Sequence, residues 1–300
     1  MSGDIAAELT AATMVARFRE LEIHLVAARE APATMEEIGR IREREFVAVG
    51  AGRGGEMDLD RYDSQWPWYL QLVSWDPEEE QIVAMYRAIH CGWALQHGGL
   101  EALRTAELFS FSDHFRSEYL QYAVELGRSV VNRNARRALA GLFSVWTGLG
   151  ALMREWTDIR YFFGNVSLYR TLPGEAVAAI LGYLFAHHRG ETGLVTAHRP
   201  VTLAPPPTIP GSLEELQTLA GEKGWTVPPI LLSYLKAHPG MLAFDVAEDD
   251  DFGGALEVAI AVPTTGITPR TMSRFIDPYR SVNSERFNLP QSPPQGRARG

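Results

Sequence analysis

A strongly apolar segment of this 300-residue chain, ALAGLFSVWTGLGALMREW at 138–156, lies between two runs rich in β-branched and aromatic residues. The run before it is EYLQYAVELGRSVV at 118–131, and the run after it is YFFGNVSL at 161–168. The central segment is long enough for a helix, and the flanking runs are typical of strands. Strands joined through a helix are usually parallel neighbours reached by a right-handed crossover. This order predicts an α/β or mixed α+β fold.

The other predicted helices and strands alternate along the chain and fit the same fold class. They are a strand at 22–28, a helix at 31–49, a hairpin of strands at 69–75 and 81–89, a short helix at 100–108, a helix at 174–188, helices at 212–224 and 228–238, and strands at 241–247 and 256–262. Pro173 favours the start of the helix at 174–188, because proline is tolerated in the first turn.

Composition divides the chain into five segments. Residues 199–211, RPVTLAPPPTIPG, contain five prolines in thirteen residues, which favours an extended linker over packed structure. The last residues lack a core-forming pattern and are expected to be disordered. The predicted organisation is an N-terminal segment at 1–21, a core at 22–198, the linker at 199–211, a segment at 212–276 that completes the fold, and a tail at 277–300.

Charge, cysteine content and hydropathy exclude several classes of function. A formal net charge of −9 argues against non-specific nucleic-acid binding, which needs a local excess of lysine and arginine. The single cysteine, Cys91, excludes an intramolecular disulfide and a cysteine-cluster zinc site, and it agrees with a reducing compartment. No window reaches roughly 18 consecutive apolar residues, and the first residues do not resemble a signal peptide. The sequence predicts a cytoplasmic protein, with any membrane contact peripheral.

Two clusters of metal-binding residue types lack the spacing of a metal site. Neighbours such as His187 and His188 do not face one another on a helix. The run Glu248–Asp251 lacks the alternating ligands and the glycine of a calcium-binding loop. We therefore predict no metal site.

The pentapeptide Glu125-Leu126-Gly127-Arg128-Ser129 places a carboxylate and a guanidinium three residues apart inside a predicted strand. In an ideal strand, residues at i and i+3 point to opposite faces. A bulge near Gly127 is needed to aim both groups at one site, and bulges occur next to active sites. Two interpretations stay open at this point: a catalytic pair, or a buried ion pair with a purely structural role.

Charged and aromatic residues at characteristic intervals precede this pentapeptide. Arg42 and Phe46 lie four residues apart on one face of a predicted helix, Asp60 and Asp63 follow within about twenty residues, and Arg87 lies inside a predicted strand. Each has an ordinary explanation on its own: a solvated helix arginine, a pair of turn caps, and an arginine at a sheet edge. Their order along the chain is more informative than any one of them.

Taken in order, these residues resemble the pattern of the acyl-homoserine-lactone synthases. The closer resemblance is to the bacterial hemolysin-like N-acyltransferases, which include the ornithine-lipid N-acyltransferases. It rests on AELFSFS at 106–112, ELGRSVV at 125–131, the apolar helix with Phe143, Trp146 and Gly148, RYFFGNVS at 160–167, and the segment at 227–262. The resemblance covers about residues 22–276.

This resemblance implies an acetyltransferase-like (GNAT-like) fold, a central mixed sheet flanked by helices with a C-terminal extension, and an amide-forming N-acyltransferase. Such an enzyme moves a long acyl chain, 3-hydroxylated in some cases, from acyl carrier protein to the amine of an amino acid such as ornithine, and its product is a lyso-aminolipid or an N-acyl amino acid. No cofactor beyond the thioester co-substrate is implied, and peripheral contact with the inner membrane fits a lipid product. Two alternatives remain open: transfer from acyl-CoA to a small amine, and a catalytically silent lipid- or carrier-binding protein.

The resemblance also suggests roles for the matching residues. Glu125 is predicted to take the proton from the amine, directly or through water, and Arg128 to orient the substrate carboxylate or to hold Glu125 in place. Backbone N–H groups near Ser129 and Val130 are predicted to stabilise the developing oxyanion. The predicted substrate-binding residues are Arg42, Phe46, Asp60, Asp63, Arg87, Ser129 and Val130.

The segment after this strand, Asn132 to Arg137, lacks the glycines that let a loop wrap a CoA pyrophosphate in ordinary acetyltransferases. It instead carries Arg133, Arg136 and Arg137 where a phosphopantetheine arm would enter. Because carrier proteins are acidic, these three arginines are predicted to bind the carrier and its phosphate. The predicted donor is therefore acyl carrier protein, with acyl-CoA as the alternative.

Overall fold

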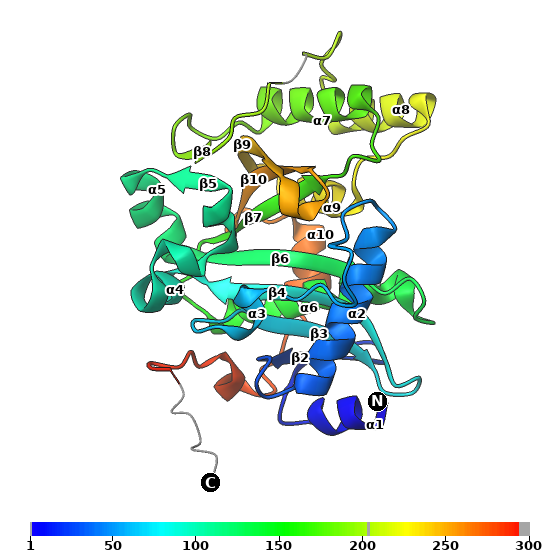
Figure 1. Ribbon diagram of the computed structural model, residues 1–300, viewed down its shortest axis with the longest axis vertical. Helices are drawn as coiled ribbons and strands as arrows, with labels where there is room; N and C mark the ends of the chain where they lie inside the picture. The colour runs from blue at the N-terminus through cyan, green and yellow to red at the C-terminus, as the bar shows by residue number, and fades with distance from the viewer. Residues whose placement is uncertain (1, 203–204, 294–300) are drawn as a thin grey trace.

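An eight-stranded mixed sheet runs through the computed structural model, which describes residues 2–202 and 205–293 (Figure 1). The strands lie in the order β1-β2-β3-β4-β6-β7-β10-β9. Their bounds are β1 (Met14–Phe18), β2 (Leu21–Val26), β3 (Leu70–Asp76), β4 (Gln81–His90), β6 (Ala123–Val131), β7 (Tyr161–Leu168), β9 (Leu242–Asp249) and β10 (Ala255–Pro263). A second, small sheet pairs β5 (Phe109–Phe111) with β8 (Val195–Ala197).

The strands β6 and β7 are parallel, whereas the other neighbouring pairs in the described sheet are antiparallel. The connection between β6 and β7 is α6 (Ala138–Glu155), the apolar helix predicted at 138–156. A parallel pair needs such a crossover, because its two strands run in the same direction. The predicted strand–helix–strand unit and the mixed α/β fold class are therefore confirmed.

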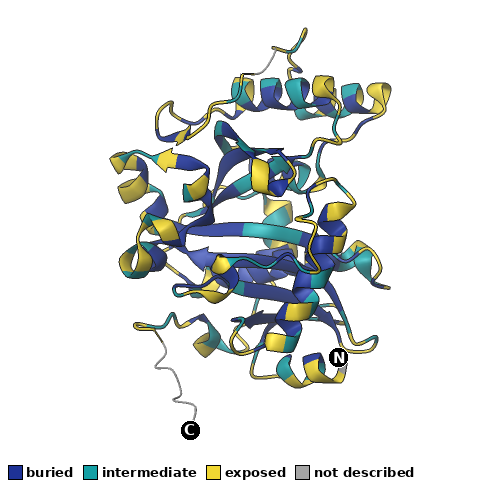
Figure 2. Ribbon diagram, in the orientation of Figure 1, coloured by how far each residue is buried: buried dark blue, intermediate teal, exposed yellow. Residues whose placement is uncertain are grey.

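Helices cover both faces of the large sheet. On one face, α6 packs its apolar side chains, including Val145 and Leu149, against strand residues such as Leu72. On the other face, α2 (Pro32–Val47) buries Ile38 and Ile41 against the strands. Figure 1 shows α2 in front of the strands and α6 behind them, and Figure 2 shows that the central strands are mostly buried. A sheet covered on both faces explains why its strands are nearly continuous apolar runs.

The other helices of the described residues are short or lie at the ends of the sheet. The α-helices are α1 (Ser2–Glu8), α3 (Arg61–Ser64), α4 (Cys91–Gly98), α5 (Asp113–Glu118), α7 (Gly174–His187), α8 (Leu213–Lys223), α9 (Pro229–Ala237) and α10 (Pro269–Thr271). The 3-10 helices are η1 (Leu100–Ala102), η2 (Arg104–Glu107), η3 (Leu120–Tyr122), η4 (Asp250–Phe252) and η6 (Ser284–Phe287), and η5 (Met272–Ile276) is a π-helical turn. Across residues 2–202 and 205–293, no helix has the length and apolar character needed to span a bilayer.

The segment after the proline-rich linker shares the main sheet with the segment before it. The described part of 199–211 forms neither a helix nor a named strand, and it follows α7, where the His187 ring donates to the Pro210 carbonyl at 2.9 Å. Beyond the linker, β10 pairs with β7 along eight residues, and β9 pairs with β10. Residues on both sides of the linker therefore build one core.

Residues 14–18 near the start of the chain and residues 277–293 near its end both contact the body of the protein. In the N-terminal segment, β1 pairs with β2 and forms one edge of the sheet. The disorder predicted for the tail is wrong for residues 277–293, because two indole N–H groups of the body bind it. Trp156 donates to the carbonyl of Phe287 at 2.8 Å, and Trp93 donates to that of Pro290 at 2.7 Å. Residues 294–300 of the predicted tail lie outside the described residues.

Candidate active site

The parallel strands β6 and β7 separate partway along their length. They pair only from Ala123, opposite Tyr161, to Leu126, opposite Gly164. A Cβ atom at Gly164 would lie 2.4 Å from the Leu126 carbonyl oxygen, so only glycine permits this close approach. Beyond this point a cavity of about 260 Å³ opens between the two strands. The cavity is the candidate active site.

A bulge in β6 brings Glu125 and Arg128 to the same cavity. Arg87 of β4 pairs with Gly127, and Met85 pairs with Val130, so β6 has one more residue than β4 over this stretch. Arg128 occupies the extra position with a φ of 55°, in the left-handed region. In a regular strand, residues three apart point to opposite faces. The extra residue of the bulge changes this, so Glu125 and Arg128 point to the same face. The structure thus contains the bulge that the sequence required near Gly127, and both charged side chains line the cavity.

Glu125 is buried, and both of its carboxylate oxygens accept hydrogen bonds. Its Oε1 accepts from the Tyr69 hydroxyl at 2.5 Å and from the Thr105 backbone N–H at 3.2 Å. Its Oε2 accepts from the Thr105 hydroxyl at 2.6 Å. Burial raises the pKa of Glu125, and these donors reduce that rise without cancelling it.

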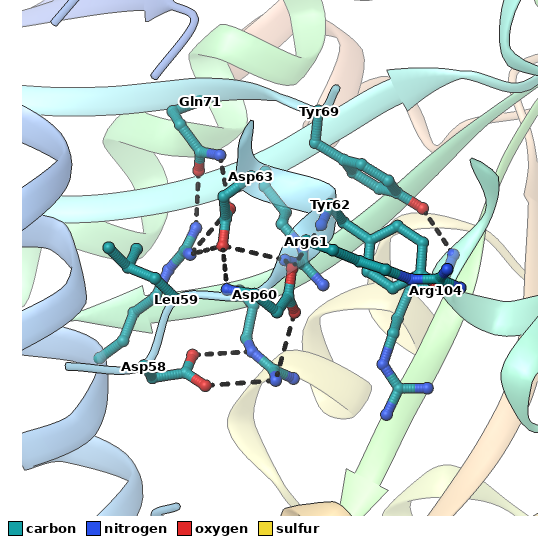
Figure 3. A network of polar contacts seen from close by, with 12 residues as sticks. Asp58, Leu59, Asp60, Arg61, Tyr62, Asp63, Tyr69, Gln71 and Arg104 are labelled. Carbon is teal, nitrogen blue, oxygen red and sulfur yellow. Dashed lines mark hydrogen bonds and ion pairs between the residues drawn. The ribbon is translucent and has the colours of Figure 1, made fainter. Parts of the chain in front are cut away.

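Arginines and aspartates form a buried network around the start of α3 (Figure 3). The Arg42 guanidinium of α2 donates to both oxygens of Asp63, at 3.1 and 3.3 Å, and to the Gln71 side chain at 2.6 Å. Arg87 of β4 binds Asp60 at 2.8 Å and lies 3.4 Å from Asp63. Asp60 and Asp63 also form the capping box that starts α3. One short loop and helix therefore supply the carboxylates for arginines from two other elements.

The network is ionised at neutral pH. Burial raises the pKa of Asp60, but the charges of Arg87, Arg128 and Arg42 outweigh burial and hold the pKa well below its usual range. Arg42 and Arg87 lower the pKa of Asp63 against the same opposing effect of burial. Among the predicted substrate-binding residues, the structure places Arg87, Phe46 and Ser129 on the cavity. It places Arg42, Asp60 and Asp63 behind the cavity lining, where each has a partner from within the chain.

Arg128 pairs with Asp58 and does not contact Glu125. Its Nε lies 2.8 Å from Asp58 Oδ2, and its Nη2 lies 3.3 Å from Oδ1. The guanidinium also lies 4.5 Å from the centroid of the Phe252 ring. The prediction that Arg128 holds Glu125 in place is therefore wrong, since Tyr69 and Thr105 do so. We give the name β6 wall to three residues of the cavity lining: Glu125 and Arg128 of β6, and Arg87 of the neighbouring strand β4.

The opposite side of the cavity has polar residues that sequence reasoning missed. Glu257 of β10 is only 4% exposed, and its Oε1 accepts a hydrogen bond from the Ser167 hydroxyl at 2.7 Å. Burial raises the pKa of Glu257 to about 7. Asn165 also lines the cavity, and its buried Oδ1 has no hydrogen-bond partner. We call these three residues the β10 wall: Asn165 and Ser167 lie on β7, and Glu257 lies on its neighbour β10. The signal in the sequence was a single acid inside the apolar run LEVAIAV at 256–262.

The cavity has an apolar side as well as a polar side. Leu126 and Val166 point to the face of the sheet that α6 covers, where they belong to its apolar cluster. Leu142 of α6 and Ile230 of α9 extend this lining. Glu125 of β6 and Glu257 of β10 point to the opposite face of the sheet, because side chains alternate along a strand and each acid is followed by a residue of that apolar cluster. The gap between β6 and β7 therefore joins a charged compartment to an apolar one.

The other residues predicted for the oxyanion and the carrier lie near the same end of β6. Ser129 lines the cavity, whereas the Val130 side chain packs in the cluster under α2. Arg133, Arg136 and Arg137 are not free cations. Arg133 binds Glu45 at 2.5 Å, Arg136 binds Glu79, and Arg137 binds Asp76 and Glu78. The acidic turn of the β3–β4 hairpin thus neutralises two of the arginines predicted to bind the carrier.

In the part of the chain that the structure describes, no three His, Cys, Asp or Glu side chains are grouped so as to hold a metal ion. Cys91 is buried, and burial raises the pKa of its thiol well above the usual value. A thiol kept protonated in this way is a poor nucleophile.

Comparisons with known proteins agree with this geometry. Residues 41–146 match the family model for the acetyltransferase (GNAT) domain. Glycine N(alpha)-acyltransferase of Bacteroides thetaiotaomicron is 32% identical over 286 residues, which cover 90% of this chain and 85% of that protein. The enzyme of the same name from Phocaeicola vulgatus is also 32% identical over 286 residues, covering 89% and 87%.

Two solved structures of acyl-homoserine lactone synthases are similar at lower identity. The CoA-dependent synthase MesI is 14% identical with a TM-score of 0.38, covering 84% of this chain and 92% of that one. The synthase LasI is 12% identical with a TM-score of 0.38, covering 85% and 94%. The family match and the mixed sheet confirm the expected GNAT-like fold, and the curated relatives confirm an amide-forming N-acyltransferase. With this degree of identity along nine-tenths of its length, the chain belongs to the glycine N(α)-acyltransferase family.

Proposed function

We propose that this enzyme transfers a long acyl chain from a carrier-bound thioester to the α-amino group of glycine, and that it releases an N-acylglycine. The cavity between β6 and β7 is the observation that carries the proposal. One compartment of the cavity is charged and suits an amino acid, and the other is apolar and suits an acyl chain. The acceptor assignment also draws on the names of the two curated relatives.

The separated strands favour a thioester arm lying between them. Past Leu126 and Gly164, the facing edges of β6 and β7 no longer pair with each other. Backbone N–H and C=O groups there can bind the amides of an extended phosphopantetheine arm. An arm in this position would place its thioester carbonyl beside Ser129, where backbone N–H groups can stabilise a developing oxyanion.

The reaction needs a proton acceptor, because the amine of an amino acid is mostly protonated at neutral pH. Three carboxylates line the cavity: Glu125 on the β6 wall, Glu257 on the β10 wall, and Asp249, which is paired with Arg104. Arg128 is proposed to attract the acceptor's carboxylate, since its guanidinium lies at the cavity with Asp58 as its carboxylate partner. Phe46 lines the cavity beside this wall, within 5.5 Å of the Arg128 guanidinium. Arg42, Asp60 and Asp63 are proposed to support the wall through Arg87.

The donor and the location are proposals of the same kind. The segment from Asn132 to Arg137 lacks glycines for a CoA pyrophosphate, which favours acyl carrier protein over acyl-CoA. A carrier contact at Arg136 would compete with the Glu79 carboxylate for the same guanidinium. Because the proposed product is a lipid, we propose that the enzyme acts at the cytoplasmic face of the membrane.

The test is an acylation assay with the purified full chain. The donors are one acyl chain on acyl carrier protein and the same chain on CoA, the acceptors are glycine and ornithine, and mass spectrometry quantifies the amide. We expect N-acylglycine, with a higher kcat/KM for the carrier-bound donor. A preference for ornithine would overturn the acceptor assignment, and a preference for acyl-CoA would overturn the donor assignment. No amide from any combination would support the catalytically silent alternative.

A further inference from the structure

The β10 wall presents oxygen atoms with unused hydrogen-bonding capacity to the cavity. Glu257 has one hydrogen-bond donor, the Ser167 hydroxyl, and among the described residues no Lys, Arg or His nitrogen lies within ion-pair distance of its carboxylate. Asn165 Oδ1 is buried and has no partner at all. Both residues line the cavity, and they lie on the adjacent paired strands β7 and β10. Buried acceptors without donors favour a ligand that brings N–H groups.

The contrast with Glu125 separates two roles for the two carboxylates. Glu125 accepts three hydrogen bonds from Tyr69 and Thr105, so its position is fixed and its capacity is largely used. Glu257 accepts one in a similarly buried position. A group that is to receive a proton needs a lone pair directed at the substrate. Only the β10 wall keeps its carboxylate available in this way.

Charged and titratable groups from four neighbouring segments face Glu257. Asp249 of β9 raises its pKa, as burial does, whereas Arg104 of η2 and Arg128 of β6 lower it. Tyr169, just after β7, is itself affected by Glu257, since burial and the Glu257 charge raise its pKa to about 12. The two arginines are each paired with an aspartate, Arg104 with Asp249 and Arg128 with Asp58. The balance leaves the pKa of Glu257 near 7, which suits a general base at neutral pH.

We infer that Glu257 and Asn165 bind the ammonium group of the acceptor amino acid and that Glu257 accepts the proton which this ammonium must lose. This inference rests on the proposed function. It assigns Glu125 to a positioning role, in which the residue holds Tyr69 and Thr105 at the end of the paired part of β6.

The acceptor nitrogen loses two protons in the proposed reaction. The Glu257 carboxylate takes one proton from the ammonium and leaves a neutral amine with a free lone pair. The nitrogen attacks the thioester carbonyl carbon, an N–C bond forms, and the C–S bond breaks as the tetrahedral intermediate collapses. The leaving thiolate receives the second proton that the nitrogen loses, and Glu257 returns its own proton to solvent. The sum is ammonium plus thioester giving amide, thiol and one proton.

The test compares Glu257→Gln with the wild-type chain on two acceptors. Glycine arrives as an ammonium, whereas aminooxyacetate is a carboxylate that is longer by a single oxygen atom and has an amino group that is already uncharged at neutral pH. We expect kcat/KM for glycine to fall by about 10²–10⁴-fold and kcat/KM for aminooxyacetate to fall by less than about tenfold. Wild-type kcat/KM for glycine rises through about pH 7 as the carboxylate forms, and the variant lacks this rise.

Two further variants complete the design. Glu248→Gln changes an acid of β9 that is paired with Arg170 outside the cavity lining, and it should leave both acceptors unaffected. Asn165→Ala removes the unpartnered oxygen and should raise the KM for glycine with little change in kcat. Equal losses of kcat/KM for the two acceptors in Glu257→Gln, or an unchanged pH profile, would overturn the inference. The proposed function would still stand if the wild-type chain formed the amide. Absence of transfer by the wild-type chain would instead overturn the proposed function.

Discussion

The two walls of the cavity are built from the same kinds of residue, yet they differ in how completely their polar groups are paired. On the β6 wall, Glu125 has three donors and Arg128 has an aspartate partner. On the β10 wall, Glu257 has one donor and Asn165 Oδ1 has none. A buried polar group without a partner costs stability, and a ligand that brings hydrogen-bond donors can offset that cost. The comparison separates a wall whose carboxylate is held by the fold from a wall whose hydrogen-bond acceptors are left available.

The largest effect should follow from breaking the support of the β6 wall at Arg42. Arg42→Met leaves Asp63 as a buried carboxylate without its main partner, and we expect the free energy of unfolding to fall by about 3–5 kcal/mol. Urea unfolding measures this loss. Arg40→Met on the same helix is the control, because the Arg40–Glu36 pair is exposed and should contribute less than about 1 kcal/mol. Similar losses in the two variants would contradict the structural role assigned to Arg42.

The second effect concerns the pH dependence of stability through Glu257. Its pKa is about 7 in the folded chain against an ordinary 4.5, so the folded state holds the proton more tightly than the unfolded state. The stability from the protonated carboxyl is present below about pH 4.5 and is lost as the pH rises through about 7. Glu257→Gln cannot ionise, so it should gain on the order of 3 kcal/mol relative to the wild type between about pH 4.5 and pH 8.

Urea unfolding of both proteins at about pH 5 and about pH 8 checks this prediction. The exposed variant Glu248→Gln should show no comparable gain, because its acid is partly solvated and ion-paired. A variant that loses stability at the higher pH would mean that Glu257 is stabilised as an anion. The β10 wall would then resemble the β6 wall.

A smaller effect is expected when one donor is removed from the β6 wall. Thr105→Val deletes the hydroxyl that donates to Glu125 Oε2 at 2.6 Å and keeps the backbone donor. We expect a loss of about 1–3 kcal/mol, because a buried acceptor is left without its partner. The pKa of Glu125, already raised by burial, should rise further, since this donor lowers it. Thr218→Val on the exposed face of α8 is the control. A neutral Thr105→Val would show that Glu125 does not depend on its donors.

The difference between the walls also explains which parts of the site could be predicted from the sequence. Glu125 and Arg128 of the β6 wall were found because they are close in sequence and match a family pattern, and a bulge near Gly127 was the condition for both to face one site. The crossover helix was found because its apolar length is a local property. Glu257 was missed because its role depends on β10 lying beside β7, a pairing between residues about ninety positions apart. The tail was misjudged for a similar reason, since Trp93 and Trp156 bind it from distant positions.

The smallest effect is expected at the arginines after β6, where sequence alone predicted a carrier-binding surface. Arg137 is a poor choice for a test, because it pairs with the buried Asp76 and its reversal would disturb the fold. Arg136 is better, because its side chain is 66% exposed and its partner Glu79 lies on the hairpin turn. We expect Arg136→Glu to lower kcat/KM for the carrier-bound donor about three- to tenfold and to leave acyl-CoA unaffected, since the charge acts on docking rather than on chemistry.

The salt dependence of this Arg136 effect distinguishes attraction from contact. The screening length falls from about 10 Å at 0.1 M to about 3 Å at 1 M, so the difference between Arg136→Glu and the wild type should shrink as salt is added. Arg154→Glu, at the other end of α6, changes a similarly exposed arginine that pairs with Asp277, and it should leave both donors unaffected. An equal loss of kcat/KM for both donors, or a loss that persists at high salt, would show that Arg136 stabilises the fold near β6 and does not attract the carrier. The pair between Arg136 and Glu79 would then be structural, and the carrier would dock at another surface.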